Sequence, residues 1–162
     1  MRMKLYVSST VFVFAVSSCN LLSGLCTYEL RSFEGDGHAL ANGTEVATGH
    51  VNLSEQRGSI VRQSFTWSVT GSLKGHVTSA AFKDSSDPTR VLLDLPILSA
   101  DRTPIAEGSA DTRQGAALGG FHDILVAEHG MIELQTDQAA TPAVAIPIST
   151  THSSDWVRPY CS

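Results

Sequence analysis

Residues 59–70 read SIVRQSFTWSVT, and this stretch decides the fold class. Apolar side chains recur at alternate positions, with Val61, Phe65, Trp67 and Val69 in one set, which also contains Gln63. The residues between them are Thr66 and Ser68, and Arg62 and Ser64 continue that second set. A period of two places the two sets on opposite faces of a β-strand. The stretch therefore predicts a strand that buries one face against a second layer.

The same alternation extends along most of the chain. It predicts further strands at residues 27–33, 45–53, 76–83, 89–97, 121–128, 131–136 and 143–149. Gly, Asp, Ser and Pro separate these segments, and residues 34–37 (EGDG) are predicted to form a turn. Residues 101–120 are predicted to be a long connection with at most one short strand. No segment predicts an amphipathic helix. The spacing predicts an all-β fold, a two-layer antiparallel β-sandwich of the immunoglobulin-like or superoxide-dismutase-like Greek-key type.

The first 18 residues predict a signal peptide. Arg2 and Lys4 make a short positive segment, and residues 5–16 follow as an apolar stretch broken only by residues 8–10. A membrane-spanning helix needs about 20 apolar residues, so this stretch is too short to be a permanent anchor. We therefore expect it to be the apolar region of a cleaved signal.

The end of that region, Val16-Ser17-Ser18-Cys19, resembles the lipobox of bacterial lipoprotein precursors. The resemblance implies that Cys19 carries a diacylglycerol and becomes the mature N-terminus. Cys26 is the weaker candidate, because the bulky Leu25 precedes it. The alternative is an ordinary secretory signal that is cut after Ser18.

The three cysteines of the chain also favour lipidation of Cys19. An odd number of cysteines leaves one thiol unpaired in an oxidising compartment. If Cys19 is acylated, Cys26 and Cys161 remain as one possible disulfide pair. This bridge would close a loop of about 135 residues, worth roughly 4 to 5 kcal/mol in the chain-entropy model. The alternative is two free thiols.

The composition predicts one domain and an acidic one. Residues 19–26 would be a short tether and residues 27–162 the domain. The whole chain carries a net charge of −5, and removal of Arg2 and Lys4 leaves nine basic and 16 acidic residues, a net charge of −7. This balance predicts no nucleic-acid partner, and it leaves the lipid as the means of membrane attachment. We expect the cell envelope as the location. Asn20 is not the Asp that marks inner-membrane retention in enteric bacteria, which favours the outer membrane or cell surface.

The sequence does not predict a catalytic site or a cofactor. None of the six histidines forms a His-x-His pair, and no Cys-x-x-Cys pair occurs. His122 and His129 are the weak candidates for a metal, but adjacent residues of a strand, such as His122 and Asp123, point to opposite faces. No serine lies in a Gly-x-Ser-x-Gly elbow.

Three stretches between residues 47 and 148 resemble the CHRD domain, a module found in many exported bacterial proteins. They are residues 47–53 (ATGHVNL), 65–82 (FTWSVTGSLKGHVTSAAF) and 131–136 (MIELQT), the last followed by Pro142 and residues 144–148. The resemblance implies a β-sandwich. Lys83 and Gln135 stand near positions where the family commonly has histidines, which implies that any ligand bound through them is lost here.

Together these observations predict a lipid-anchored exported β-sandwich that serves as a non-enzymatic binding or structural module of the cell envelope. The alternative is a metal-binding protein or metal-dependent enzyme on a superoxide-dismutase-like sandwich. A third hypothesis is an assembly or adhesion subunit that offers a strand edge to an envelope protein partner.

Overall fold

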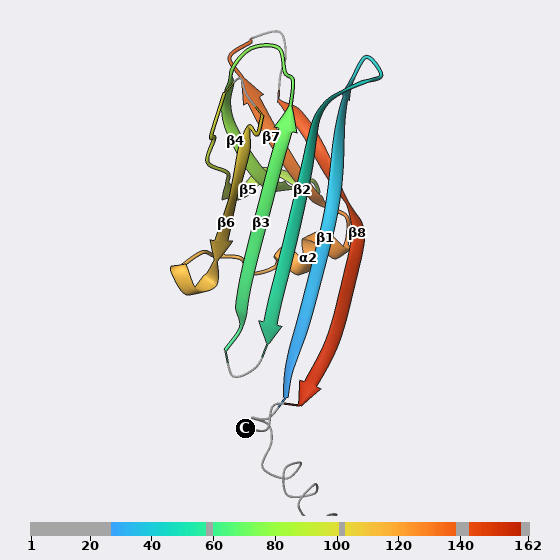
Figure 1. Ribbon diagram of the computed structural model, residues 1–162, viewed down its shortest axis with the longest axis vertical. Helices are drawn as coiled ribbons and strands as arrows, with labels where there is room; N and C mark the ends of the chain where they lie inside the picture. The colour runs from blue at the N-terminus through green and yellow to red at the C-terminus, as the bar shows by residue number, and fades with distance from the viewer. Residues whose placement is uncertain (1–26, 58–59, 101–102, 139–142, 160–162) are drawn as a thin grey trace, which may run out of the picture.

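The computed structural model describes residues 27–57, 60–100, 103–138 and 143–159, and within them it shows an all-β protein (Figure 1). The strands are β1 (Thr27–Ala41), β2 (Thr44–Arg57), β3 (Arg62–Gly71), β4 (Val77–Asp84), β5 (Asp87–Asp94), β6 (Ala106–Asp111), β7 (Gly130–Thr136) and β8 (Val144–Pro159). A 3-10 turn, η1 (Thr112–Gln114), and one short helix, α2 (Phe121–Val126), complete the described elements. The all-β prediction is confirmed.

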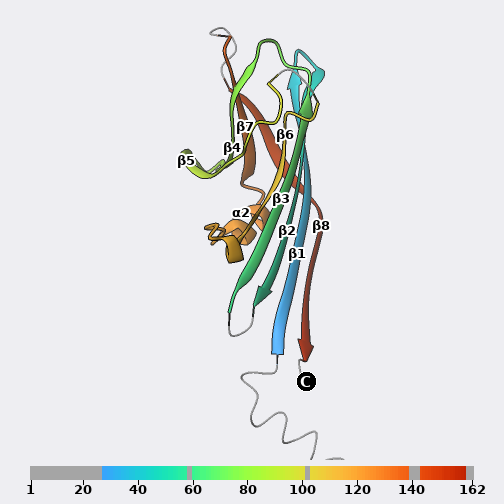
Figure 2. The ribbon, with the colours of Figure 1, turned by 60° about the vertical axis from the view of Figure 1, so that its left-hand side comes forward.

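The eight strands form one continuous antiparallel sheet in the order β5-β4-β7-β8-β1-β2-β3-β6. β8 links its two parts, because residues 144–147 pair with β7 and the rest of the strand pairs with β1. Four strands separate β4 from β3 in this order, yet the rings of Phe65 on β3 and Phe82 on β4 lie 5.0 Å apart. The sheet therefore curls back on itself (Figure 2). A sandwich of two separate sheets is not confirmed, because hydrogen bonding runs through all eight strands.

An aromatic cluster fills the space that the curled sheet encloses. Phe65 contacts Phe82, and its ring centroid lies 5.2 Å from that of Phe121 on α2 in an edge-to-face arrangement. Phe82 and Phe121 are 5.3 Å apart. All three side chains are at most 1% exposed, and Leu125 on α2 is fully buried with them. The cluster joins β3, β4 and α2, so the core depends on residues that are distant in the sequence.

The predicted alternation of residues 59–70 is confirmed within β3. Gln63, Phe65, Trp67 and Val69 are buried, and the side chains between them are partly or fully exposed. Val61 was expected to share the buried face, but it lies before the strand and is 51% exposed. The strand begins one residue later, at Arg62.

The turn predicted at residues 34–37 is wrong, because β1 runs straight through it. The hairpin turn lies at Asn42 and Gly43, whose φ angles of 52° and 76° suit the tight connection between β1 and β2. The glycines inside β1 have another reason. A Cβ on Gly35 would lie 2.7 Å from Cγ2 of Ile148, so a glycine there lets β8 pack closely against β1.

Residues 121–128, predicted as a strand, form the helix α2 and the turn after it. The helix follows Gly120, whose φ of 84° is easily reached by glycine. Phe121, Ile124 and Leu125 have the spacing of one helical face, and Phe121 and Leu125 are buried. The short apolar run was ambiguous, since periodicity over so few residues does not separate strand from helix.

Four strands continue beyond the core. β8, β1, β2 and β3 extend past the level of α2 to the end at which β1 begins (Figures 1 and 2). We call this part, residues 29–32, 54–57, 62–64 and 153–155, the projecting half. None of the helices in the described ranges is long and apolar enough to cross a membrane.

Candidate functional site

The projecting half presents two different faces because side chains alternate along each strand. On the inner face, toward α2, lie Arg31, Glu55 and Gln63. On the outer face lie the neighbouring residues Ser32, Ser54 and Ser64. The register aligns each set across the sheet, since Arg31 pairs with Glu55, and Glu55 with Gln63. One face is therefore charged and the other is lined with small hydroxyls.

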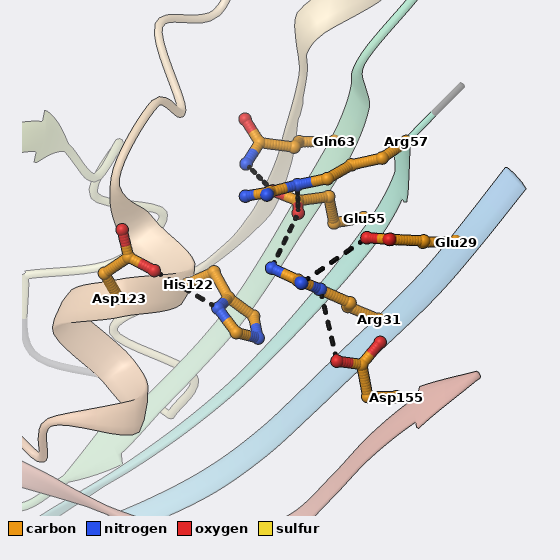
Figure 3. Close-up of polar contacts among 8 residues, drawn as sticks. All are labelled: Glu29, Arg31, Glu55, Arg57, Gln63, His122, Asp123 and Asp155. Carbon is orange, nitrogen blue, oxygen red and sulfur yellow. Dashed lines mark hydrogen bonds and ion pairs between the residues drawn. The ribbon is translucent and has the colours of Figure 1, made fainter. Parts of the chain in front are cut away.

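Glu55 is the centre of the inner face (Figure 3). Its side chain is only 1% exposed, and it accepts hydrogen bonds from Nε2 of Gln63 and Nε of Arg57. Nη1 of Arg31 lies 4.0 Å from Oε1 of Glu55. A buried carboxylate is costly unless such partners surround it, so Glu55 holds β1, β2 and β3 together at this level.

Arg31 bridges Glu55 to the edge of the sheet. Its guanidinium lies 3.4 Å from a carboxylate oxygen of Glu29 and 3.4 Å from one of Asp155 on β8. Its Nε is buried and makes no hydrogen bond to a described residue. His122 points from α2 toward this cluster, and its side chain is 17% exposed (Figure 3). The inner face is thus largely occupied by its own ion pairs.

The outer face carries a row of four serines on four neighbouring strands, and Asp111 continues the row on a fifth. Ser154 on β8 pairs in register with Ser32 on β1, Ser32 with Ser54 on β2, Ser54 with Ser64 on β3, and Ser64 with Asp111 on β6. We call these five residues the serine row. Because each serine is shorter than the residues flanking it, the row forms the floor of a trough.

A hollow of about 350 Å³ lies over the serine row. Its lining includes the row itself, the outward-facing residues Leu30, Gln56, Arg62 and Arg113, and the strand segments at Arg31, Glu55 and Gln63. Eight of these twelve residues, Asp111 included, face outward by strand alternation, and Arg113 lies beside Asp111. The hollow therefore opens on the outer face. Its volume is at the lower end of the range for ligand sites in proteins.

Two of the four floor hydroxyls are free for a ligand. Oγ of Ser32 and Oγ of Ser154 bond each other at 2.6 Å. The hydroxyls of Ser54 and Ser64 have no partner among the residues that the structure describes. Ser54 is exposed and Ser64 is half-buried.

Charge at one end of the hollow comes from Asp111, Arg113 and Arg62. Arg113 donates to Asp111 through Nη2 at 2.7 Å and through its backbone N–H at 2.7 Å. These bonds, with the positive charges of Arg113 and Arg62, lower the pKa of Asp111 to about 2. Arg62 is exposed and forms no ion pair within the described ranges. The guanidinium of Arg62 therefore has no ion-pair partner among the described residues.

The structure separates the two histidines that the sequence left as weak metal candidates. His122 lies on α2 and faces the inner cluster, with Nδ1 3.5 Å from Oδ1 of Asp123. The assumption that these two residues occupy a strand is wrong, since they are helical. His129 is exposed and lies between the turn after α2 and the start of β7. Among the described residues, no group of three histidines, cysteines or acidic residues could hold a metal ion.

Two other histidines pair with carboxylates on the outer face of β1 and β2. Nδ1 of His50 lies 2.7 Å from Asp36, and Nδ1 of His38 lies 2.6 Å from Glu45. Both pairs are exposed, and exposed polar pairs of this kind contribute little to stability.

The predicted lipidation site Cys19 and the predicted bridge between Cys26 and Cys161 lie outside the described residues, as do residues 1–18. The nearest described positions are informative all the same. Thr27 and Pro159 are register partners at the ends of β1 and β8. One of the two cysteines directly precedes Thr27 in the sequence, and the other follows Pro159 by two residues.

The sequence indicated the outer face but not the site. Alternation in residues 59–70 placed Arg62 and Ser64 opposite Phe65. Nothing in the sequence showed that Ser32, Ser54 and Ser154 align with Ser64, because that alignment depends on the register of four strands. The one sequence signal is that a serine stands next to a core apolar residue in β1, β2 and β3, as Ser32 does beside Phe33 and Ser54 beside Leu53.

Comparison with family models found no match, and no curated protein and no solved structure matches the chain. The resemblance to the CHRD domain stays a prediction.

Proposed function

We propose that this protein is a lipid-anchored, exported, non-enzymatic binding module of the cell envelope, and that the hollow over the serine row is its binding surface. The observation that carries the proposal is a set of unused polar groups that face one hollow. The hydroxyls of Ser54 and Ser64 and the guanidinium of Arg62 have no partner in the described structure. The inner face, by contrast, satisfies most of its own charges.

The sequence supports the anchor. Residues 16–19 resemble a lipobox, and β1 begins at Thr27, only eight residues after Cys19. The acidic domain offers no net positive charge with which to bind an anionic membrane, so the acyl chains would carry the attachment. Envelope location, at the outer membrane or cell surface, is part of the same proposal.

Labelling with radioactive palmitate tests the anchor. We expect the wild-type chain to be labelled and to sediment with membranes, and the Cys19→Ala variant to be unlabelled. Cys26→Ala is the matched control, because it removes another cysteine of the same region and should leave labelling intact. A soluble, unlabelled wild-type protein would refute the anchor.

Amide NMR tests the binding surface. We expect a soluble digest of bacterial envelope polysaccharide to shift resonances of Ser32, Ser54 and Ser64, and to leave β4 and β5 unchanged. Shifts confined to other strands would refute the hollow as the binding surface.

One observation favours a second candidate function, assembly through a strand edge. Beyond residue 147, β8 pairs with β1 on one side, and no described strand pairs with its other side. The register shift opposite Glu34 and Gly35 interrupts that edge, and such an irregularity discourages edge pairing. Size-exclusion chromatography separates the candidates, since a strict monomer at high concentration contradicts assembly.

A further inference from the structure

We infer that the hollow over the serine row binds an acidic saccharide, with sugar hydroxyls on the serines and one anionic group on Arg62. The inference rests on the proposed binding function and names its ligand class. It follows from the hydroxyls that the hollow offers, from the scarcity of apolar residues in its described lining, and from the position of Arg62.

Over Ser32, Ser54 and Ser64, a ligand must bind through side chains. Ser32, Ser54 and Ser64 lie on strands that have a hydrogen-bonded neighbour on each side at this level. Their backbone groups take part in the sheet ladders, so an extended peptide cannot add to them as a further strand. Among the described lining residues Leu30 is the only large apolar one, so they offer few apolar contacts to the side chains of a peptide.

The floor of the hollow matches a ligand rich in hydroxyls. A serine hydroxyl both donates and accepts a hydrogen bond, as a sugar hydroxyl does. Ser54 and Ser64 are register neighbours on adjacent strands, which are about 5 Å apart. Gln56, on the rim, adds an amide donor and an amide acceptor.

Arg62 selects an anion. It lies near Asp111, whose pKa its charge lowers, and Arg113 already neutralises that carboxylate. Arg62 can therefore donate to a carboxylate or phosphate of the ligand. A nucleic acid fits poorly, since the lining has no described aromatic ring for stacking and the mature chain carries a net charge of −7.

The proposed anchor places the hollow close to a membrane surface. Leu30, in the lining, is eleven residues from Cys19, and eleven extended residues span at most about 40 Å. Acidic saccharides near a membrane are headgroups of glycolipids and chains of envelope polysaccharide, which share the chemistry that the hollow recognises.

Isothermal titration of the purified full chain in detergent tests the inference. The acidic probe is a galacturonic acid hexamer, the neutral probe is maltohexaose, and inorganic phosphate is the anion alone. We expect the acidic hexamer to bind about tenfold or more tightly than either other probe, since hydrogen bonds to a charged group add to those of the hydroxyls. Vesicles with an acidic glycolipid, against vesicles with a neutral one, would then distinguish membrane headgroups from free polysaccharide.

Two variants and two matched controls locate the site. Arg62→Gln should weaken binding of the acidic hexamer about tenfold or more, and Ser54→Leu should abolish it by filling the hollow. Arg90→Gln and Ser79→Leu make the same changes at exposed positions of β5 and β4, and should leave binding unchanged.

The inference is overturned if maltohexaose binds as tightly as the acidic hexamer, if phosphate alone does so, or if Arg62→Gln has no effect. If maltohexaose binds as tightly as the acidic hexamer and Ser54→Leu abolishes both, the proposed binding function stands and only the ligand class is wrong. Absence of binding by every probe would overturn the ligand class, whereas palmitate labelling and the NMR mapping test the proposed function separately.

Discussion

Two neighbouring inward-facing rows of β1, β2 and β3 differ completely in chemistry. Phe33, Leu53 and Phe65 form one inward-facing row across β1, β2 and β3, and none is more than 1% exposed. The next inward-facing row, two residues along, contains an arginine, a glutamate and a glutamine, Arg31, Glu55 and Gln63. The curled sheet and α2 cover the first row with apolar side chains, whereas Glu55 and Gln63 of the second row are buried among polar side chains. We call the part of the sheet at Phe33, Leu53 and Phe65 the core half. Apolar burial therefore stabilises the core half, and ion pairs stabilise the projecting half.

The largest expected effect is in the core half. Phe65→Ala removes a ring that contacts Phe82 and Phe121, and we expect it to lower the free energy of unfolding by about 3 to 5 kcal/mol. Urea denaturation measures this. Thr66→Ala, on the opposite face of the same strand, should change it by less than about 0.5 kcal/mol. Similar effects for the two variants would mean that the aromatic cluster is not the centre of stability.

The second effect concerns the end of the projecting half. Thr27 and Pro159 are register partners, and Cys26 and Cys161 lie just outside them in the sequence, so a bridge between the two cysteines would close a loop of about 135 residues. We expect Cys26→Ser to lower stability by about 2 to 4 kcal/mol under oxidising conditions and to have little effect in reductant. Hydrogen exchange should rise first in the projecting half.

Thiol titration of the unfolded chain provides the control for this bridge. The Cys19→Ala variant should show no free thiol if the bridge is present and two if it is absent. Two free thiols would contradict the bridge.

These differences also explain how much of the fold the sequence could predict. Strands with one apolar face, such as β2 and β3, were predicted closely because burial imposes the period of two. The second half of β8 was missed, because residues 150–154 are polar on both faces and have no such period. These residues are a strand because β1 pairs with them, which is a long-range contact that no local pattern records.

The residues of the candidate site also differ in how far the sequence predicts them. The outward direction of Arg62 and Ser64 followed from alternation, but the hollow required the register of five strands. Glu55 gave no signal, since a glutamate near the end of a strand normally faces solvent. Its burial depends on Gln63 and Arg57, and on the position of Arg31 in another strand.

The third prediction separates charge from packing in the inner cluster. Glu55→Ala leaves Gln63 and Arg57 without their acceptor, and we expect a loss of about 1 to 3 kcal/mol in unfolding free energy. Glu55→Gln keeps the volume and one acceptor, and should lose less. Glu45→Ala is the control, since its pair with His38 is exposed and should contribute about 0.5 kcal/mol or less. Equal losses for the alanine and glutamine variants would show that the charge alone matters.

The smallest effect belongs to the outer face, where Asp111 pairs with Arg113. The hydrogen bonds from Arg113 hold the pKa of Asp111 at about 2 in the folded protein, below its ordinary value of 3.8. A pKa lowered by folding contributes stability above the ordinary value, and that contribution disappears as the pH falls from about 4 to about 2. We expect Asp111→Asn to remove this pH dependence, and Arg113→Gln to return the pKa of Asp111 toward 3.8.

Carboxyl ¹³C NMR between pH 1.5 and 6 measures the titration directly. A midpoint near 4 for Asp111 in the wild-type protein would contradict the ion pair, and an unchanged midpoint in Arg113→Gln would assign the shift to another group. The stability change should be slight, because ion pairs at a surface are largely screened by solvent. The two faces of the projecting half therefore differ in what their charges do. Ion pairs of the inner face stabilise the sheet. On the outer face a change of charge costs the fold little, which leaves that face free to serve binding.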